Sequence, residues 1–428
     1  MKKIALTLLI LGNIIMAATI DEIKVKSLKV PLIFEEDKRL PLVTMQFIFE
    51  NSGSIADGSK AGLAKFSSRV MNEGTKKLGS SKFAELLESK AIHISASTGK
   101  ETFVLELGCL KEEFDEGLKY FGMLLSEPNL SQDAVKKVKT TTLGSLARKE
   151  NDFDYIASNE LKALLFNDSV LANPSSGTIE SVKEISLKDV KEFLSDNLVS
   201  SKLIVAVGGD VDLESSKDKI SKIIELLPKG KASKPKKYEA SGDAKEKIVL
   251  KETQQAYIYF GSPYDISVNS QDYYKARVAT FILGAGGFGS RLMEEIRVKK
   301  GLAYSAYARL SVTKSSSYMS GYLQTKLESL KDAKETVKYV VEDFVKNGVT
   351  EDELEQTKKF LLGSEPLRVE TMSQRLHRTF MEFYNGQELG SSLKELQKIE
   401  KLKLEDLNRF IKEHKEILDM SFAIVTKE

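Results

Sequence analysis

The chain has very few of the side chains from which metal and redox sites are built. Its 428 residues include one cysteine, three histidines and no tryptophan. A single cysteine cannot form an internal disulfide. Because Cys109 lies in a strand-like apolar run, we expect a buried apolar residue rather than a reactive thiol. No two of His93, His377 and His414 lie at metal-ligand spacing, so the sequence predicts no metal site built from them.

An excess of charge of either sign is also missing. The 64 basic and 62 acidic residues give a net charge of +2, which gives no sign of a nucleic-acid partner. The chain is longer than one ordinary core supports, at roughly 100–200 residues per domain, so two or more domains are expected. An apolar fraction of 41% is enough to fill their cores.

Long apolar runs are absent except at the N-terminus. There Met1-Lys2-Lys3 precedes an apolar run over Ile4–Met16 and the small residues Ala17-Ala18. This order is typical of a secretory signal peptide, assigned to residues 1–18. An uncleaved anchor is the alternative, but the run is shorter than the ~20 residues of a membrane span. We therefore expect an exported, periplasmic protein that is soluble after cleavage and has no membrane span.

Two halves of the chain have the same order of predicted elements. In each half a strand (44–50, 255–260) precedes a helix, a hairpin and a further helix. In each half the final unit is a helix leading into a strand, and Leu187, Asp189, Phe193 and Leu194 correspond to Leu404, Asp406, Phe410 and Ile411, each pair 217 apart. This recurrence suggests an internal duplication, although helix-then-strand units also resemble one another by chance.

The predicted fold class is α+β. Two similar domains, 19–227 and 248–428, flank a Pro/Gly/Lys-rich linker at 228–247. Each domain should be a largely antiparallel sheet with helices packed on one face. At the start of the first domain we expect one extended stretch, 23–30, which Pro31 interrupts.

The stretch Gly62–Thr75 predicts a helix that ends at a glycine. Leu63, Phe66 and Val70 fall on one face at helical spacing. Lys65, Ser68 and Arg69 fall together on the opposite side, because positions three and four apart are neighbours on a helix. The sequence around this helix, with Gly-Leu-Ala before it and Gly-Thr after it, resembles the insulinase/pitrilysin family of zinc peptidases.

That resemblance implies a degenerate zinc site. The family's inverted motif, H-x-x-E-H, holds zinc with two histidines and uses the glutamate as general base. Lys65 and Arg69 stand at the histidine positions and Ser68 at the glutamate position. A third ligand, a glutamate on a later helix, should fall near Ser145, yet no acidic residue occurs in 134–149. The resemblance implies that this chain holds no catalytic residues and no zinc of its own.

A glycine-rich segment in the second half has two interpretations. Gly284, Gly286 and Gly289 match a G-x-G-x-x-G dinucleotide loop, but that loop requires a preceding strand. The residues before it have helical spacing, which favours a plain glycine connection between helices.

The longer string from Ser290 to Tyr304 resembles the signature of the family's C-terminal domain. It reads Ser-Arg-Leu, then Glu-Ile-Arg, then Gly-Leu-Ala-Tyr. In the family, the Arg and Tyr reach toward peptide bound at the partner domain's zinc, and the matching residues are Arg297 and Tyr304. The alternative is a surface ion pair for the arginine and a core-capping tyrosine. A further departure is Ser95-Ala96, where the family's substrate-binding edge strand carries Asn-Ala.

Two functions follow from these expectations. The first is a catalytically silent subunit of a heteromeric zinc peptidase, which would contribute Arg297, Tyr304 and half of a clamshell to a homologous partner that carries H-x-x-E-H. The second is a non-enzymatic scaffold or peptide-binding protein of the same fold. The first function places zinc in the partner subunit and makes a peptide the substrate, and a homodimer is possible in isolation.

Overall fold

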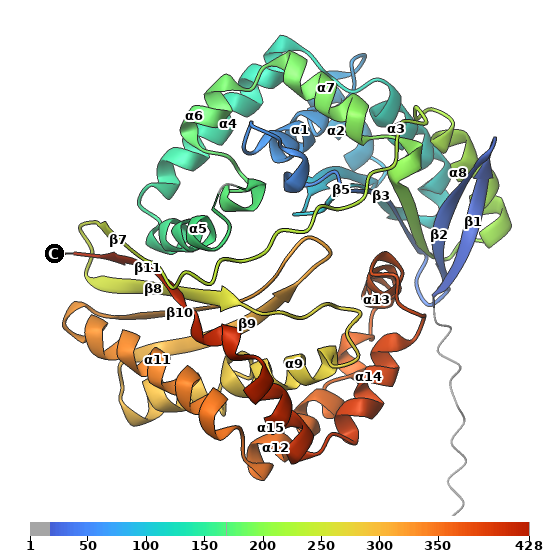
Figure 1. Cartoon of the computed structure of the whole chain (residues 1–428). Helices are drawn as coiled ribbons and strands as arrows, with labels where there is room; N and C mark the ends of the chain where they lie inside the picture. Colours follow the sequence, from blue (N-terminus) through green and yellow to red (C-terminus); the bar gives the residue numbers. More distant parts are fainter. Residues whose placement is uncertain (1–17, 168, 428) are drawn as a thin grey trace, which may run out of the picture.

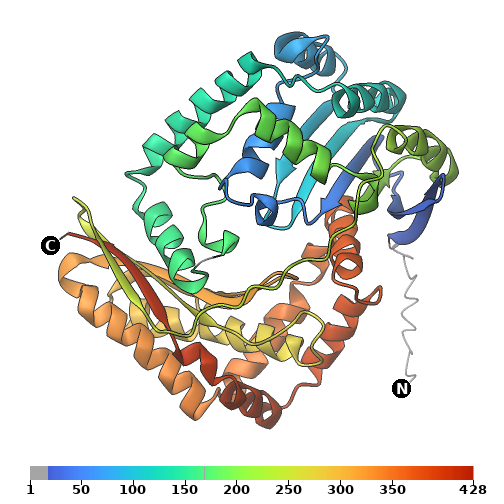
Figure 2. The same cartoon turned by 45° about the horizontal axis from the view of Figure 1, so that its top comes forward.

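The computed structural model describes residues 18–167 and 169–427, so all but the last residue of the predicted signal peptide, 1–18, lies outside it. Two domains, each a sheet with its own helices, face one another (Figures 1 and 2). In the described part of the chain, none of the helices combines the length and apolar character needed to span a bilayer.

In its described residues, the first domain has six strands and eight α-helices. The strands are β1 (Thr19–Val25), β2 (Leu28–Glu36), β3 (Leu42–Glu50), β4 (His93–Thr98), β5 (Thr102–Leu110) and β6 (Leu203–Gly209). The helices are α1 (Leu63–Met71), α2 (Gly79–Glu88), α3 (Phe114–Ser126), α4 (Gln132–Lys149), α5 (Phe153–Leu165), α6 (Ile179–Glu184), α7 (Leu187–Asn197) and α8 (Leu213–Ile224).

Up to residue 427, where the described part ends, the second domain has five strands, seven α-helices and two π-helical segments. The strands are β7 (Glu246–Leu250), β8 (Gln255–Pro263), β9 (Ala303–Val312), β10 (Ser317–Lys326) and β11 (Ser421–Thr426). The helices are α9 (Tyr273–Thr280), α10 (Arg291–Met293), α11 (Leu330–Asn347), α12 (Glu351–Gly363), α13 (Met372–Tyr384), α14 (Ser391–Glu400) and α15 (Leu404–Glu413), with π-helical η5 (Phe281–Ala285) and η6 (Glu294–Lys299).

The two sheets share one strand order. The first is ordered β1-β2-β6-β3-β5-β4 and the second β7-β11-β8-β10-β9, so the orders match once β1 is set aside. In both, one pair is parallel (β2 with β6, β7 with β11) and the remaining pairs are antiparallel. The predicted α+β class with two similar, largely antiparallel domains is confirmed.

The start of the first domain differs from the prediction. The expected single stretch 23–30 is a hairpin, because the chain turns at Lys26, whose φ is +54°, between β1 and β2. Pro31 does not interrupt a strand but lies inside β2, opposite Glu22 of β1. Pairing of β2 with β6 begins only at Leu32, so the missing N–H of proline costs no hydrogen bond on that side.

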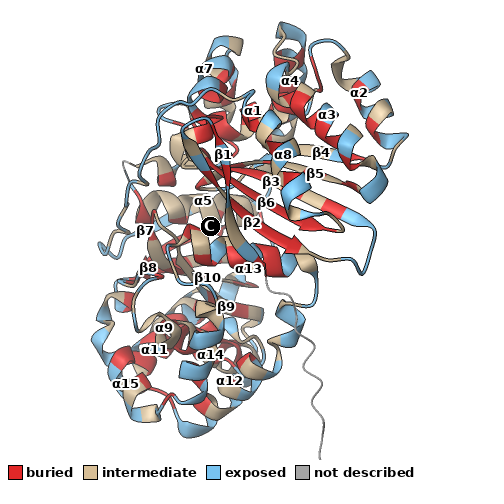
Figure 3. Ribbon diagram, turned by 90° about the vertical axis from the view of Figure 1, so that its right-hand side faces the viewer, coloured by how far each residue is buried: buried red, intermediate tan, exposed pale blue. Residues whose placement is uncertain are grey.

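Each sheet is covered by its own helices on one face and by a helix of the other domain on the opposite face. On β3, Met45, Phe47 and Phe49 are fully buried in the first domain's main core. Ile48 points to the other face and is also buried, where it joins a cluster with Leu376 of α13. Figure 3 shows buried residues on the strands and on the helix faces turned toward them.

Each domain contributes one helix that packs on the sheet of the other domain. Helix α13 of the second domain packs on β2 and β6, where Leu376 and Tyr384 meet Ile33, Ile204 and Ala206. Helix α5 of the first domain packs on β8 and β11, where Leu161 and Leu165 meet Ala423 and Tyr259. Both helices lie between the domains in Figure 1. Neither helix is among those predicted from the sequence.

The segment between α8 and β7 contains no helix or strand and runs between the domains (Figures 1 and 2). The backbone of this segment forms hydrogen bonds with both domains. The carbonyl of Ser233 accepts from Asn51 Nδ2 at 2.6 Å, and Tyr238 N donates to the Ser315 carbonyl at 2.7 Å. Ser241 N donates to the carbonyl of Leu165 at 2.7 Å, so the segment also holds the end of α5.

Candidate functional site

Helix α1 is fixed at its start by contacts that require glycine and a buried carboxyl group. Gly62, the N-cap, has φ +87°, and a Cβ there would lie 2.5 Å from the backbone nitrogen of Gly177. The Asp57 carboxylate accepts hydrogen bonds from Gly62 N at 2.8 Å and from Ala64 N at 2.7 Å. Burial raises the pKa of Asp57 to about 7, against these two hydrogen bonds, which lower it.

The apolar face of α1 is as predicted, but the polar face is smaller. Leu63, Phe66 and Val70 are buried in the first domain's core. Ser68 is buried too, with 3% of its surface exposed, and its Oγ donates to the Lys65 carbonyl at 2.9 Å. Only Lys65 and Arg69 of the three motif positions therefore remain partly accessible.

The two cations of α1 contact hydroxyl groups on neighbouring segments. Lys65 Nζ donates to Ser176 Oγ at 3.1 Å, and Arg69 Nη1 donates to Thr142 Oγ1 on α4 at 2.8 Å. Burial lowers the pKa of Lys65, and the positive charges of Arg69 and Lys149 lower it further. The polar face of α1 at Lys65 and Arg69 is therefore a region of positive charge that disfavours any cation.

No group of three or more His, Cys, Asp or Glu side chains that could hold a metal ion occurs within residues 18–167 and 169–427. Arg69 faces Thr142, three residues before Ser145 on the same helix, where the sequence places the third ligand position. Neither residue offers the carboxylate or imidazole donor that zinc requires.

The edge strand β4 is occupied by a side chain that the sequence analysis did not single out. Asn72, the C-cap of α1, donates from Nδ2 to the Ala96 carbonyl at 2.9 Å and accepts from Ala96 N at 2.7 Å. Its amide thus takes both backbone groups of Ala96, as a neighbouring strand would. The sequence did offer one indication of this contact, since Asn72 directly follows α1, the helix that packs on β4.

The glycine-rich segment is not a nucleotide loop. Gly284 lies in π-helix η5, and the element directly before η5 is helix α9 rather than a strand. A Cβ at Gly284 would lie 2.3 Å from the Ala308 backbone nitrogen on β9, so this glycine allows close packing of helix on strand. The preference for a glycine connection after a helix is confirmed.

Arg297 and Tyr304 lie together at the end of η6 and the start of β9. The guanidinium carbon of Arg297 is 4.2 Å from the centre of the Tyr304 ring and 4.5 Å from that of Phe288. Tyr304 is 82% exposed and Phe288 71% exposed, so neither ring caps the core. Among the described residues Arg297 has no carboxylate partner, and its N–H groups are available to a ligand.

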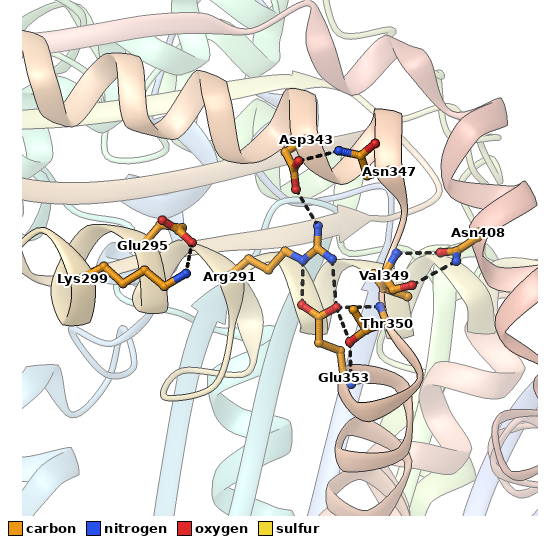
Figure 4. A network of polar contacts seen from close by, with 9 residues as sticks. All are labelled: Arg291, Glu295, Lys299, Asp343, Asn347, Val349, Thr350, Glu353 and Asn408. Atoms are coloured by element: carbon orange, nitrogen blue, oxygen red, sulfur yellow. Dashed lines mark hydrogen bonds and ion pairs between the residues drawn. The ribbon is translucent and has the colours of Figure 1, made fainter.

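The segment that carries Arg297 is anchored by Arg291 (Figure 4). Arg291 Nε and Nη2 donate to the two oxygens of Glu353 at 2.6 and 2.9 Å, and Nη1 reaches Asp343 at 3.3 Å. Glu353 also accepts from Thr350 N at the start of α12. This bidentate ion pair is largely buried and holds the beginning of α10 against α11 and α12.

Comparisons with known proteins agree with this architecture. The family model described as insulinase (peptidase family M16) matches residues 42–179, and the model described as peptidase M16 inactive domain matches residues 184–361. Over all of this chain and 99% of the relative, the sequence is 43% identical to a Helicobacter pylori protein named non-peptidase homolog YmxG.

Solved structures share the fold. A crystal structure titled peptidase M16 inactive domain, from Pseudomonas fluorescens, superposes with a TM-score of 0.87 at 23% identity, over 96% of this chain and 98% of that chain. The periplasmic protease PqqL from Escherichia coli gives a TM-score of 0.76 at 14% identity, and the match covers 48% of its length.

The chain belongs to peptidase family M16, the insulinase family. The family predicted from the sequence is therefore confirmed. The prediction of a non-catalytic member agrees with the description of the matching second-half model and with the name of the Helicobacter pylori relative.

Proposed function

We propose that this protein is a non-catalytic subunit of an exported, heteromeric zinc peptidase. It supplies half of the peptide-enclosing chamber and the Arg297–Tyr304 pair, whereas a homologous subunit with an intact H-x-x-E-H motif supplies zinc and the general base. The chain itself binds no zinc.

One contrast carries the proposal. The face of α1 presents Lys65 and Arg69, which cannot ligate zinc, whereas Arg297 and Tyr304 keep an exposed stack with no carboxylate partner among the described residues. Both side chains can donate hydrogen bonds to a peptide carbonyl. Such donors stabilise the oxyanion of a tetrahedral intermediate. A subunit without zinc can therefore assist hydrolysis at a zinc ion that another chain holds.

Two comparisons support the arrangement. The relative from Helicobacter pylori, which matches along its whole length, is named a non-peptidase homolog. The match to PqqL covers 48% of a protein titled a periplasmic protease, as expected if two units of this size face one another. A periplasmic location for this chain also follows the predicted signal peptide.

Reconstitution tests the proposal. The purified chain is mixed with the purified H-x-x-E-H homologue from the same organism, and hydrolysis of a fluorogenic peptide library is followed. The mixture should be faster than the homologue alone, and Arg297→Ala should reduce that gain by about 100- to 1000-fold, the range for removal of one oxyanion donor. Tyr304→Phe, which keeps the ring but removes the hydroxyl, separates stacking from hydrogen bonding.

Arg409→Ala is the matched control. This arginine of α15 is exposed, and within the described residues it pairs only with Asp406 on the same helix, so its loss should leave the gain in hydrolysis unchanged. A mixture no faster than the homologue alone rejects the proposal. The scaffold function is favoured instead if size exclusion shows a stable complex and neither Arg297→Ala nor Tyr304→Ala changes its rate of peptide hydrolysis.

A further inference from the structure

Five cations gather where the first domain turns toward the second. Lys65 and Arg69 of α1, Lys149 at the end of α4, Lys162 of α5 and Lys100 in the β4–β5 turn are here called the basic cluster. The charge of Lys149 acts on both Lys65 and Lys162, and that of Lys100 acts on Lys162, which links all five. Each side chain is only partly exposed.

The basic cluster has no carboxylate within ion-pair distance among the residues that the structure describes. Its hydrogen-bond acceptors are hydroxyls, namely Ser176, Thr142 and, for Lys100 Nζ at 3.3 Å, Ser316. Lys149 Nζ lies 4.1 Å from the centre of the Tyr155 ring. By contrast, two other partly buried lysines have carboxylate partners: Lys60 reaches Asp189 at 2.6 Å and Lys217 reaches Asp21 at 2.7 Å.

Three carboxylates near the cluster in sequence, Asp152, Asp154 and Glu101, are engaged by other donors. Asp152 accepts from Tyr155 N, and Asp154 accepts from the Tyr259 hydroxyl and from Gln324 Nε2. Glu101, next to Lys100, is buried and accepts from Ser315 N at 2.7 Å and from the Tyr384 hydroxyl at 2.9 Å. Half-buried, unpaired charge of one sign is unfavourable, so an anion brought by a ligand would stabilise it.

A cavity of about 240 Å³ adjoins the cluster between the two domains. Lys100 and Lys162 line it together with the hydroxyls and amide of Ser54, Thr98, Asn173 and Ser175, and no carboxylate is among its described lining residues. Phe166, Val170 and Leu171 supply apolar walls. Cations, backbone-binding polar groups and apolar walls together suit a peptide better than a bare inorganic anion.

We propose that the basic cluster and the adjoining cavity bind a short acidic peptide segment through its aspartate or glutamate carboxylates. The cations lie on four separate elements, so several spaced carboxylates are engaged at once. This inference goes beyond the proposed function, because it concerns binding by this chain alone and needs no catalytic partner.

Fluorescence anisotropy with the isolated full-length protein tests the inference. The probes are a labelled hexapeptide with three glutamates and the same peptide with three glutamines. The glutamate peptide should bind about tenfold more tightly or better, as charge-assisted hydrogen bonds imply, and added salt should weaken it. Equal binding of the two peptides overturns the inference.

Substitutions locate the site. Lys149→Gln and Lys162→Gln should each weaken binding of the glutamate peptide about tenfold. Lys188→Gln removes an equal charge from α7, at a side chain 81% exposed and paired with Glu192, and should change nothing. Thermal unfolding provides the second readout: Lys162→Gln should unfold no earlier than the parent, since it relieves repulsion, so lost binding is not lost folding.

Inorganic phosphate is the competing anion. At concentrations equal to that of the peptide it should not displace the peptide, because it spans one cation pair rather than the cluster. Full displacement at equal concentration, or an equal effect of Lys188→Gln, overturns the inference in favour of a small-anion site or of nonspecific charge.

Discussion

Arg375 and Glu35 are 340 residues apart in sequence, yet Arg375 Nε donates to Glu35 Oε1 at 2.7 Å in the buried space between the domains. Arg375 is 8% exposed and Glu35 is 3% exposed. The same guanidinium reaches Asp37 Oδ2 at 2.9 Å and the carbonyls of Val369 and Glu370. One side chain of α13 thereby ties the second domain to the end of β2.

Arg375→Met should destabilise the protein strongly. Burial already raises the pKa of Glu35 against the effect of Arg375, so without the guanidinium the carboxylate is a buried and uncompensated charge. Breaking a buried ion pair from one side costs about 3–5 kcal/mol, to be measured as the free energy of unfolding in urea.

Two variants complete that experiment. Arg409→Met breaks an exposed pair with Asp406 and should cost no more than about 0.5 kcal/mol. Adding Glu35→Leu to Arg375→Met should recover part of the loss, because it removes the stranded charge. Equal losses for Arg375→Met and Arg409→Met would show that the buried pair does not hold the domains together.

The stability of the protein should fall between pH 5 and pH 7 because of Asp57. Its pKa, near 4 in an unfolded chain, is raised to about 7 by burial, so the folded state binds its proton more tightly. The stabilisation is complete below pH 4 and is lost as the pH rises through 7. At about 1.4 kcal/mol per pH unit, this group alone should cost the protein about 2 kcal/mol between pH 5 and pH 7.

Asp57→Asn provides the comparison, since the amide oxygen can still accept from the start of α1 but cannot ionise. Its stability should vary less than that of the parent over the same range, by calorimetry at matched ionic strength. The same pH dependence in both proteins would assign the titration to another group.

The purified protein should contain no stoichiometric zinc, and restoring a site should depend on Thr142. Lys65→His, Ser68→Glu and Arg69→His rebuild the motif on α1 but leave it without a third ligand. Because Arg69 already touches Thr142, adding Thr142→Glu should give tighter zinc binding than adding Ser145→Glu.

Metal analysis after dialysis against a weak chelator measures this difference. A full equivalent of zinc retained by the unmodified protein would contradict the account of a lost site. Tighter binding with Ser145→Glu than with Thr142→Glu would restore the sequence-based position of the third ligand.

Features that depend on local periodicity could be predicted from the sequence. The apolar face of α1, the alternation along β3 and the helix before the glycine segment are patterns of 3.6 or 2 residues, and each is found in the structure. Ser68 was expected on the polar face, yet its side chain is buried and bonded within its own helix. A small hydroxyl does not reveal which side of a helix it faces.

Helices α5 and α13 were not predicted either, although both have cap residues, Asp152 and Thr371, that accept from the first turn. A cap and an apolar face predict that a helix forms, but not which sheet covers that face. That choice depends on contacts between residues hundreds of positions apart, which no local pattern encodes.

The sequence by itself determined the family, the α+β class and the loss of metal-ligating side chains on α1, because residue types and short-range spacing fix these. Only the tertiary structure shows that a helix of each domain packs on the sheet of the other domain. It alone decided that Asn72 covers the Ala96 edge of β4, that Lys149 lies near Lys65, and that Lys100 and Lys162 line one cavity. Those relationships join side chains from separate elements, and packing between elements determines them.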